Sequence, residues 1–294
     1  MTESPRVSVI TPTYNRADFI GQAVQSVLVQ DYTDFELLIV DDGSTDNTEA
    51  ILQPFLKDSR IHYSKQANQG QSLARNNALA QARGEFICFL DSDNAWVPGK
   101  LSMQIAYLDS NPNVDVVYGD NIFINEAGEE TSRENMTRHS GFIAYPMLKD
   151  NCVAMNTTMA RRRCFDEMGG MSGTRRVADD YDLWLRFSAR FRFHYMAEYL
   201  AYYRVMEQQI SSDKTARFDS NEAIIHDFRR QFPDVLPRKR FDEAFAFFYM
   251  RKARFLAAAG QRRQAWCEIL RALGYRPFSR VVWRAVAAIA FKRS

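Results

Sequence analysis

The first 120 residues alternate short apolar runs with segments of helical periodicity, and this order constrains the fold more than any other feature. Five runs are typical of strands: Val7–Ile10, Phe35–Val40, Ile61–Ser64, Glu85–Leu90 and Val114–Tyr118. The segments between them have helical spacing: Ile20–Leu28, Thr45–Leu56, Ser72–Arg83 and Lys100–Leu108. Parallel strands need crossover connections, which are usually helices. The order therefore predicts an α/β fold with a doubly wound, mostly parallel, Rossmann-like sheet.

The chain changes character after residue 120. Residues 120–178 contain more turn signals, Asp179–Phe191 again has the pattern of a helix, and the chain reads as helical from about Asn221. One tetratricopeptide-like helical hairpin is indicated by the spacing of Ala253, Gly260, Ala265, Ala272 and Pro277. We expect a first domain at residues 1–215 and a C-terminal helical extension at residues 216–294.

Composition indicates an ordinary globular protein, with 46% hydrophobic and 25% charged residues. The N-terminus lacks the pattern of a signal peptide, and the apolar run Val281–Phe291 is too short to cross a bilayer. The four cysteines, which show no metal-ligand spacing, read as reduced thiols: Cys88, Cys152, Cys164 and Cys267. These features predict a cytoplasmic protein, and nothing in them indicates a nucleic-acid partner.

The net charge of +2 hides an asymmetry. Residues 251–294 contain eleven Lys or Arg and one acid, Glu268, and so carry +10. Arg280 and Arg284 lie on one side of a helix whose other side is apolar: Phe278, Val281, Val282, Ala285, Val286 and Ile289. Two explanations stay open. The stripe packs on the helical hairpin, or it lies in a membrane interface and makes the protein peripheral on the cytosolic face.

Acidic residues follow the strand Glu85–Leu90. Asp91 and Asp93 flank Ser92, and on a strand residues two apart face the same side. Ligands of such sheets bind beyond the carboxyl ends of the strands. Two converging carboxylates with few further ligands suit Mn²⁺ or Mg²⁺ and leave room for a substrate's phosphates.

Three further clusters each have a structural and a functional interpretation. Asp41–Ser44 is either a strand-to-helix turn or a nucleotide contact, in which Gly43 lets the backbone approach the ligand. Asn68–Gly70 precedes a helix whose amides and Arg75 could face phosphate, although Arg75 could equally be a surface arginine. The acidic residues of Asp179–Asp182 either cap the helix or include a catalytic carboxylate.

Six motifs occur in order: Thr11-Pro-Thr-Tyr-Asn-Arg16, Asp41-Asp-Gly-Ser-Thr-Asp46, Asn68-Gln-Gly with Ala74-Arg-Asn76, Leu90-Asp-Ser-Asp-Asn94, Gly169-Gly170 and Asp180-Tyr-Asp-Leu-Trp184. Together they resemble family 2 of the inverting glycosyltransferases, which have the GT-A fold. The resemblance covers roughly residues 5–212. It implies transfer of a sugar from a nucleotide diphosphate, with UDP as the expected nucleotide, to a glycan or lipid-linked acceptor in cell-surface polysaccharide synthesis.

The resemblance also implies roles for individual residues. Asp180 would be the catalytic base, and Asp93 would hold the metal, with Asp91 beside it at the ribose or a bound water. The donor-binding residues would be Thr11, Pro12, Tyr14, Arg16, Asp41, Asp42, Asn68, Gly70, Arg75, Asp91, Ser92, Asp93, Arg204 and Ser211. Tyr203-Arg204 and Gln209-Ile-Ser211 resemble the segment that closes over the diphosphate.

Three positions depart from the family's common pattern. Asp179 stands where Glu is frequent, Asn94 where an acid is frequent, and Met206 where His is frequent. The alternatives to a glycosyltransferase are a sugar-nucleotide pyrophosphorylase and a catalytically inactive sugar-nucleotide binder. The first usually has a Gly-rich basic loop after its first strand, which Thr11–Arg16 lacks, and the second would be favoured if Asp93 or Asp180 were absent.

Overall fold

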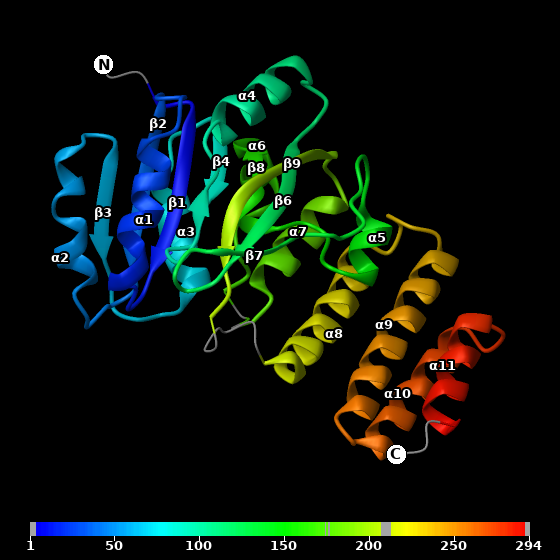
Figure 1. Ribbon diagram of the computed structural model, residues 1–294. Coiled ribbons are helices and arrows are strands. Elements are labelled where there is room, and N and C mark those ends of the chain that lie inside the picture. The colour runs from blue at the N-terminus through cyan, green and yellow to red at the C-terminus, as the bar shows by residue number, and fades with distance from the viewer. Residues whose placement is uncertain (1–3, 174, 176, 207–212, 292–294) are drawn as a thin grey trace. The chain divides into compact units, whose positions relative to one another are not determined.

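The computed structural model describes residues 4–173, 175, 177–206 and 213–291 (Figure 1). The chain divides into two compact units, one formed by Met1–Phe142 with Cys152–Ser212 and the other by Ile143–Asn151 with Asp213–Ser294. The sequence analysis drew a single boundary after residue 215. The structure instead groups the short helix α5 (Ala144–Lys149) with the C-terminal helices.

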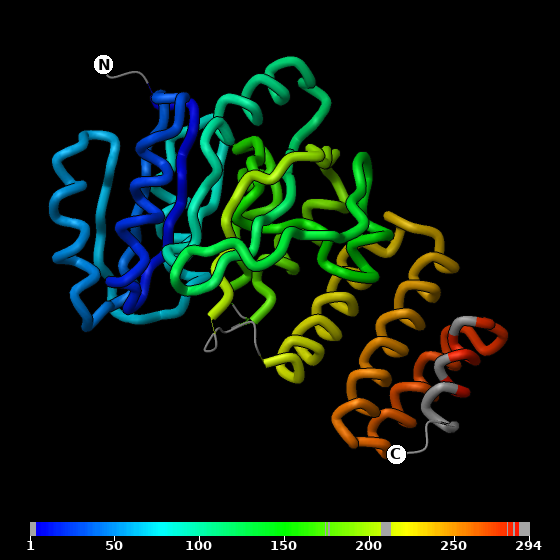
Figure 2. Tube along the Cα trace, viewed as in Figure 1, coloured from blue at the N-terminus to red at the C-terminus, as the bar shows by residue number. Residues whose placement is uncertain are grey.

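The first unit is built on one mixed sheet. The main path through the described strands has the order β3 (Ile61–Lys65), β2 (Phe35–Asp41), β1 (Val7–Thr13), β4 (Phe86–Phe89), β8 (Met159–Arg161), β6 (Val116–Ile124), β9 (Phe193–Arg204) and β5 (Ala95–Trp96), and β7 (Glu130–Arg133) pairs with β6. Strands β1 to β4 are parallel. Strand β8 runs antiparallel between β4 and β6, and β9 returns from far along the chain to lie parallel to β6 (Figure 2).

Helices cover both faces of this sheet. One face packs against α1 (Ala17–Leu28), α2 (Thr48–Leu52) and α4 (Lys100–Ser110), and Cys88 of β4 points into that layer. Phe89, the next residue, points the other way, with its ring 5.9 Å from Phe165 and 6.2 Å from Trp184. Those residues belong to α6 (Arg162–Met168) and α7 (Asp179–Ser188), which share this face with α3 (Gln71–Gln81). The predicted doubly wound fold is confirmed.

The element ends differ from the sequence-based expectation in two places. Strand β1 continues through Pro12 to Thr13, whereas the sequence predicted a strand over Val7–Ile10. Beyond Ile10 this strand pairs with β2 alone, and a residue without an N–H is tolerated at such a half-paired end. The helix expected at Thr45–Leu56 is shorter, because α2 ends at Leu52 and a 3-10 turn, Phe55–Lys57, follows. A second such turn spans Met155–Thr157.

The second unit is helical. It contains α5, α8 (Lys214–Gln231), α9 (Arg238–Ala258), α10 (Arg262–Tyr275) and α11 (Arg280–Phe291). Helices α9 and α10 pack around buried small side chains, among them Ala265 and Ala272. Val282 of α11 is buried, and Val286 packs against Ala253 and Ile269. Part of the apolar stripe of the tail therefore packs on the hairpin. None of the described helices is long and apolar enough to cross a membrane.

A testable consequence concerns the connection between α3 and β4. A Cβ on Gly84 would lie 2.4 Å from the backbone nitrogen of Ser8 and 2.7 Å from the carbonyl carbon of Val7, so β1 leaves no room for a side chain. We expect Gly84→Ala to lower the free energy of unfolding by about 1–3 kcal/mol or more. Gly21→Ala is the matched control, because its Cβ would meet Ile51 at an ordinary 3.5 Å inside α1. The control should gain up to about 1 kcal/mol in urea denaturation, and equal stability of the two variants would contradict the prediction.

Candidate active site

The carboxyl ends of β1 to β4 lie along one edge of the sheet, because these strands are parallel. The loops that leave this edge are residues 14–16, 42–47, 66–70 and 90–94. Most of the residues predicted from the sequence lie in these loops, at the strand ends, or near the N-terminus of α3 or α7. Side chains from distant parts of the chain therefore meet here, and their hydrogen bonds decide what each can do.

Asp41 and Asp42 are buried and hold neighbouring loops. Asp41 accepts hydrogen bonds from the amide of Ser44 at 2.7 Å and from the hydroxyl of Tyr63 at 2.9 Å. Asp42 accepts from the amides of Gln69 and Gly70, both at 2.8 Å, and from the side-chain amide of Gln66 at 2.7 Å. The loop from Gln66 to Gly70, which includes the exposed Asn68, is thus fixed in place by Asp42.

The position of Gly43 explains why this turn needs a glycine. Its φ angle is +82°, and a Cβ here would lie 3.0 Å from the backbone nitrogen of Asn68 and 3.2 Å from the carbonyl oxygen of Gln66. In one of the two interpretations drawn from the sequence, Gly43 lets the backbone approach a nucleotide. In the structure the segment that approaches Gly43 is the protein's own 66–68 backbone.

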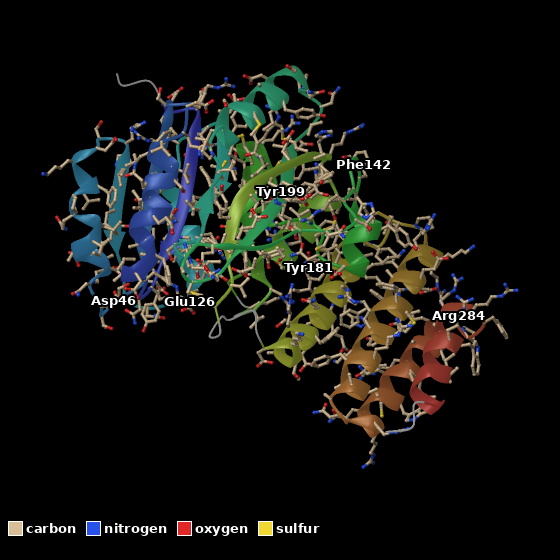
Figure 3. The ribbon with its side chains drawn as sticks, viewed as in Figure 1. Asp46, Glu126, Phe142, Tyr181, Tyr199 and Arg284 are labelled. Carbon is tan, nitrogen blue, oxygen red and sulfur yellow. The ribbon has the colours of Figure 1, made fainter. Side chains whose placement is uncertain are left out.

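The end of β1 leads into a turn that is pinned from two sides. Thr11 and Pro12 are buried in the strand, and Tyr14 is 45% exposed. Among the described atoms, the Thr11 hydroxyl has no hydrogen-bond partner. Asn15 has a φ of +49°, and its amide oxygen accepts a hydrogen bond from the backbone of Thr45 at 2.8 Å. Asp46 (labelled in Figure 3) accepts from the first amide of α1 and fixes the helix that follows this turn.

Arg75 is the central cation of the site. Its side chain is 2% exposed, and its guanidinium contacts Asp91 Oδ1 at 2.5 Å and Asp179 Oδ2 at 2.7 Å. Burial alone would lower the pKa of Arg75, but the negative charges of Asp179, Asp91 and Asp180 outweigh it and raise the pKa above its ordinary value. Arg75 is therefore a buried cation that links two loops, and the alternative that it is an ordinary surface arginine is wrong.

Asp91 has partners on both carboxylate oxygens. Oδ1 accepts from Arg75, and Oδ2 accepts from the side-chain amide of Asn156 at 3.1 Å. Asn156 also accepts from the backbone amide of Asp91 at 2.7 Å, so one asparagine fixes both the side chain and the backbone of this residue. The geometry favours a positioning task for Asp91 over direct contact with a metal.

Asp93 differs from Asp91. Its side chain is 16% exposed, and within the described part of the chain it has one cationic partner, Arg16 Nε, at 3.4 Å. The pKa of Asp93 is raised to about 6, because burial and the neighbouring charge of Asp91 raise it by more than Arg16 lowers it. Asp93 is therefore a carboxylate with too little positive charge around it. A cation at this place would be attracted.

Arg204, at the end of β9, is buried and fully engaged with protein acceptors. Its guanidinium donates to the backbone oxygen of Asp93 at 3.0 Å, to those of Asn125 and Glu126 (Figure 3) at 2.9 and 2.8 Å, and to the side chain of Gln22. Burial lowers the pKa of Arg204. The structure shows an arginine that fixes the loop carrying Asp93. The diphosphate contact implied by the resemblance stays a prediction.

The segment between Asp91 and Asp93 is held from the same side. Ser92 is buried, and the side-chain oxygen of Asn94 accepts from the backbone amide of Arg204 at 2.7 Å. An acid, which is frequent at this position in the family, could accept the same hydrogen bond. Ser211, the remaining residue expected to bind the donor, lies outside the described residues.

The acids at the start of α7 have separate partners. Asp179 is buried and accepts from Arg75 and from the hydroxyl of Ser72 at 2.9 Å. Asp182 accepts from Arg186 at 3.0 Å, one helical turn further on. Asp180 is partly buried, and its backbone amide donates to Asp179 at 3.0 Å. Arg75 thereby places the Asp179–Asp180 pair beside the Asp91–Asp93 loop.

Some residues of the site were not found from the sequence. Asn156, Gln22 and Tyr63 each bond a site residue directly, but none belongs to a local motif. Asn156 lies 65 positions from Asp91, in the irregular segment 120–178. No spacing rule connects such residues, so only the folded chain reveals them.

The chain was compared with known proteins. Residues 8–181 match the family described as Glycosyl transferase family 2. The chain is 33% identical over 228 residues to an Escherichia coli protein named UDP-Glc:alpha-D-GlcNAc-diphosphoundecaprenol beta-1,3-glucosyltransferase WfgD, covering 76% of this chain and 86% of that protein. It is 34% identical over 191 residues to an uncharacterized glycosyltransferase of Rickettsia felis, covering 63% of this chain but only 30% of that protein.

The fold is similar to that of a solved structure. Mannosyltransferase PcManGT from Pyrobaculum calidifontis, in complex with GDP-Man and Mn²⁺, aligns with a TM-score of 0.64 and 19% identity, over 98% of this chain and 80% of that one. At this identity the likeness concerns the fold, which is of the GT-A type with additional C-terminal helices.

The buried link at Arg75 yields a prediction on stability. Arg75→Met keeps most of the length of the side chain but leaves the buried carboxylate of Asp179 and the partly buried carboxylate of Asp91 without their cation, so we expect a loss of about 3–5 kcal/mol in the free energy of unfolding. Arg190→Met removes an exposed pair with Glu167 in the same unit and should cost less than about 1 kcal/mol. Urea denaturation of both variants measures the difference, and equal losses would show that the Arg75 link does not stabilise the fold.

Proposed function

The chain belongs to glycosyl transferase family 2, and we propose that it transfers a sugar from a nucleotide diphosphate to an acceptor hydroxyl with inversion at the anomeric carbon. The observation that carries this proposal is the cluster at the strand ends. Asp93 is a carboxylate with little positive charge near it, and its cationic partner in the described chain is Arg16. Arg75 links the Asp91–Asp93 loop to the Asp179–Asp180 pair. The family resemblance of the sequence is confirmed by the match over residues 8–181.

We propose UDP as the nucleotide and a lipid-linked glycan as the acceptor. The name of the Escherichia coli relative specifies a UDP-Glc donor and a diphosphoundecaprenol-linked acceptor, and that match covers most of both proteins. An acceptor of this kind would place the protein at the cytosolic face of a membrane, in the synthesis of a cell-surface glycan. The structurally similar mannosyltransferase is in complex with GDP-Man instead. The fold alone therefore does not decide which nucleotide is bound.

In this proposal Asp180 is the base. A carboxylate within hydrogen-bond reach of the acceptor hydroxyl accepts its proton as the oxygen attacks the sugar. The choice of Asp180 rests on the family resemblance of the motif Asp180-Tyr-Asp-Leu-Trp184. Arg75 and Asp179 would keep Asp180 at a fixed place relative to Asp93. A single displacement needs only one such carboxylate and inverts the anomeric centre.

The residues present fit a divalent cation bound largely by the donor substrate. Asp93 offers a carboxylate with little compensating charge, and Asp91 is engaged with Arg75 and Asn156. The described chain has no cluster of three or more protein ligands, and Mg²⁺ and Mn²⁺ commonly bind through one or two carboxylates plus phosphates. A cation held by Asp93 would act as a Lewis acid that neutralises charge on the leaving diphosphate. Arg16 would contribute positive charge from the protein itself.

The pyrophosphorylase alternative receives no support from the family match. An inactive sugar-nucleotide binder differs from the proposed enzyme in turnover alone, so an assay separates the two. Release of UDP that increases with acceptor indicates transfer. Release of sugar phosphate when pyrophosphate is added would indicate a pyrophosphorylase. Binding of the nucleotide sugar without release of any product would indicate an inactive protein.

Asp180→Asn tests the base. The substitution keeps the size of the side chain but removes its ability to accept a proton, so we expect turnover to fall by roughly 10² to 10⁴ while donor binding stays nearly unchanged. Asp182→Asn is the control, because Asp182 bonds Arg186 and is assigned no catalytic role. UDP release with acceptor measures both variants. Near-normal turnover of Asp180→Asn would remove Asp180 from this role.

Asp93→Asn tests the metal ligand through two opposite effects. Its carboxyl has a raised pKa of about 6 against an ordinary 3.8, so the folded state binds this proton more tightly and loses stability as pH rises through that interval. At pH 7 the variant should therefore be more stable, by up to about 3 kcal/mol, and the gain should vanish below pH 3.8. Metal-dependent turnover should be lost, as it should in excess chelator.

Thermal unfolding at neutral and acidic pH checks the first effect, and a UDP-release assay checks the second. Asp18→Asn, which changes an acid in the first turn of α1, is the control for a change of net charge. Full activity of Asp93→Asn, or of the native protein in excess chelator, would contradict the metal assignment.

A further inference from the structure

Helix α10, the connection that follows it and the start of α11 expose large apolar side chains. Phe278 is 94% exposed and Trp283 is 53% exposed. Trp266 and Leu270, one helical turn apart on α10, are 37% and 66% exposed. These four are among ten exposed large hydrophobic residues of the described chain, yet they lie within one short segment. Such a concentration differs from the single exposed apolar residues that are normal on soluble proteins.

The outward side of α11 also carries positive charge. Arg280, Trp283, Arg284 and Ala287 are exposed and have the spacing of one helix face, and Arg284 is labelled in Figure 3. Val282 and Val286 point the other way, into the helical unit. The stripe expected from the sequence is thus divided. Val282 and Val286 pack internally, whereas Phe278 of the same stripe is exposed. Trp283, which was not part of the predicted stripe, is exposed between the two arginines in sequence.

The residues Phe278, Arg280, Trp283 and Arg284 are called the tail surface from here on. Residues 251–294 carry +10, so this surface lies in the most basic part of the chain. Tryptophan and phenylalanine favour the boundary between headgroups and acyl chains, and arginine favours the phosphates above it. The indole N–H of Trp283 already donates to the backbone oxygen of Pro277 at 2.8 Å, so its ring can enter an apolar layer without an unpaired donor.

We propose that the tail surface binds the anionic surface of a lipid bilayer. A protein partner would also cover apolar side chains, but the excess of arginine over acids in this segment complements a surface of phosphates in particular. Each arginine near such a surface adds about 1 kcal/mol, and Phe278 and Trp283 add apolar burial. The contact deepens the proposed function by naming a membrane as the partner, but it does not depend on catalysis.

Flotation with vesicles tests this proposal on the full chain, without donor or acceptor. The native protein should float with phosphatidylglycerol vesicles and much less with phosphatidylcholine vesicles, and the binding should weaken as salt screens the charges. Arg280→Gln with Arg284→Gln should lower the partition coefficient by about fivefold for each charge removed. Phe278→Ser should lower it by at least about fivefold, and its exposure makes an effect on folding negligible.

Matched controls separate the tail surface from a general effect of charge or hydrophobicity. Val29→Ser removes an apolar side chain that is 55% exposed on the first unit, and Arg190→Gln removes an exposed arginine there. Both controls should float like the native protein. Equal flotation of tail and control variants, no flotation at all, or self-association that Phe278→Ser abolishes would overturn the proposal. The UDP-release assay is independent, so failure of either proposal leaves the other intact.

Discussion

A single buried guanidinium holds the site together. Arg75 contacts Asp91, which follows β4 and lies 16 positions further along the chain, and Asp179, which begins α7 and lies 104 positions further along. The buried Asp179 and the partly buried Asp91 would repel each other, and each is separated from some of the water that would stabilise its charge. With Arg75 between them they become an attractive link, and the two loops cannot drift apart without exposing a broken ion pair. The positions of Asp93 and Asp180 both follow from this link.

Asp93 shows the opposite situation, and the contrast separates framework from function. The protein supplies Asp91 with two partners but leaves Asp93 with a long contact to Arg16 and a raised pKa. Arg204 nevertheless fixes this loop, because its side chain donates to the backbone oxygen of Asp93 and its backbone amide donates to the side chain of Asn94. A carboxylate that is rigidly placed and poorly compensated destabilises the folded chain at neutral pH. Such an arrangement suits a group whose missing positive charge arrives with the substrate.

The sequence predicted those parts of the protein that follow from local pattern. The alternation of apolar runs and helical spacing gave the doubly wound fold, and strand-end acids indicated where the site would be. The sequence could not predict that Asn156 forms hydrogen bonds to Asp91 or that Arg204 forms one to the Asp93 loop. It also could not predict that the 66–68 backbone lies close to Gly43. Each of these contacts joins segments distant in sequence. The antiparallel insertion of β8 between β4 and β6 was missed for the same reason, because pairing partners are not encoded in the run that forms a strand.

Backbone strain is concentrated at the same edge of the sheet. Among the residues that the structure describes, only Asn15 and Ala178 have a positive φ without being glycine. Asn15 directly precedes Arg16, and Ala178 directly precedes Asp179. A left-handed conformation costs an alanine about 1–2 kcal/mol, so the surrounding contacts must impose it. Asn15 is held by Ser44 and Thr45, and Ala178 is followed at once by the anchored Asp179. Two strained backbone positions therefore stand directly before Arg16 and Asp179, and such strain is typical of functional sites.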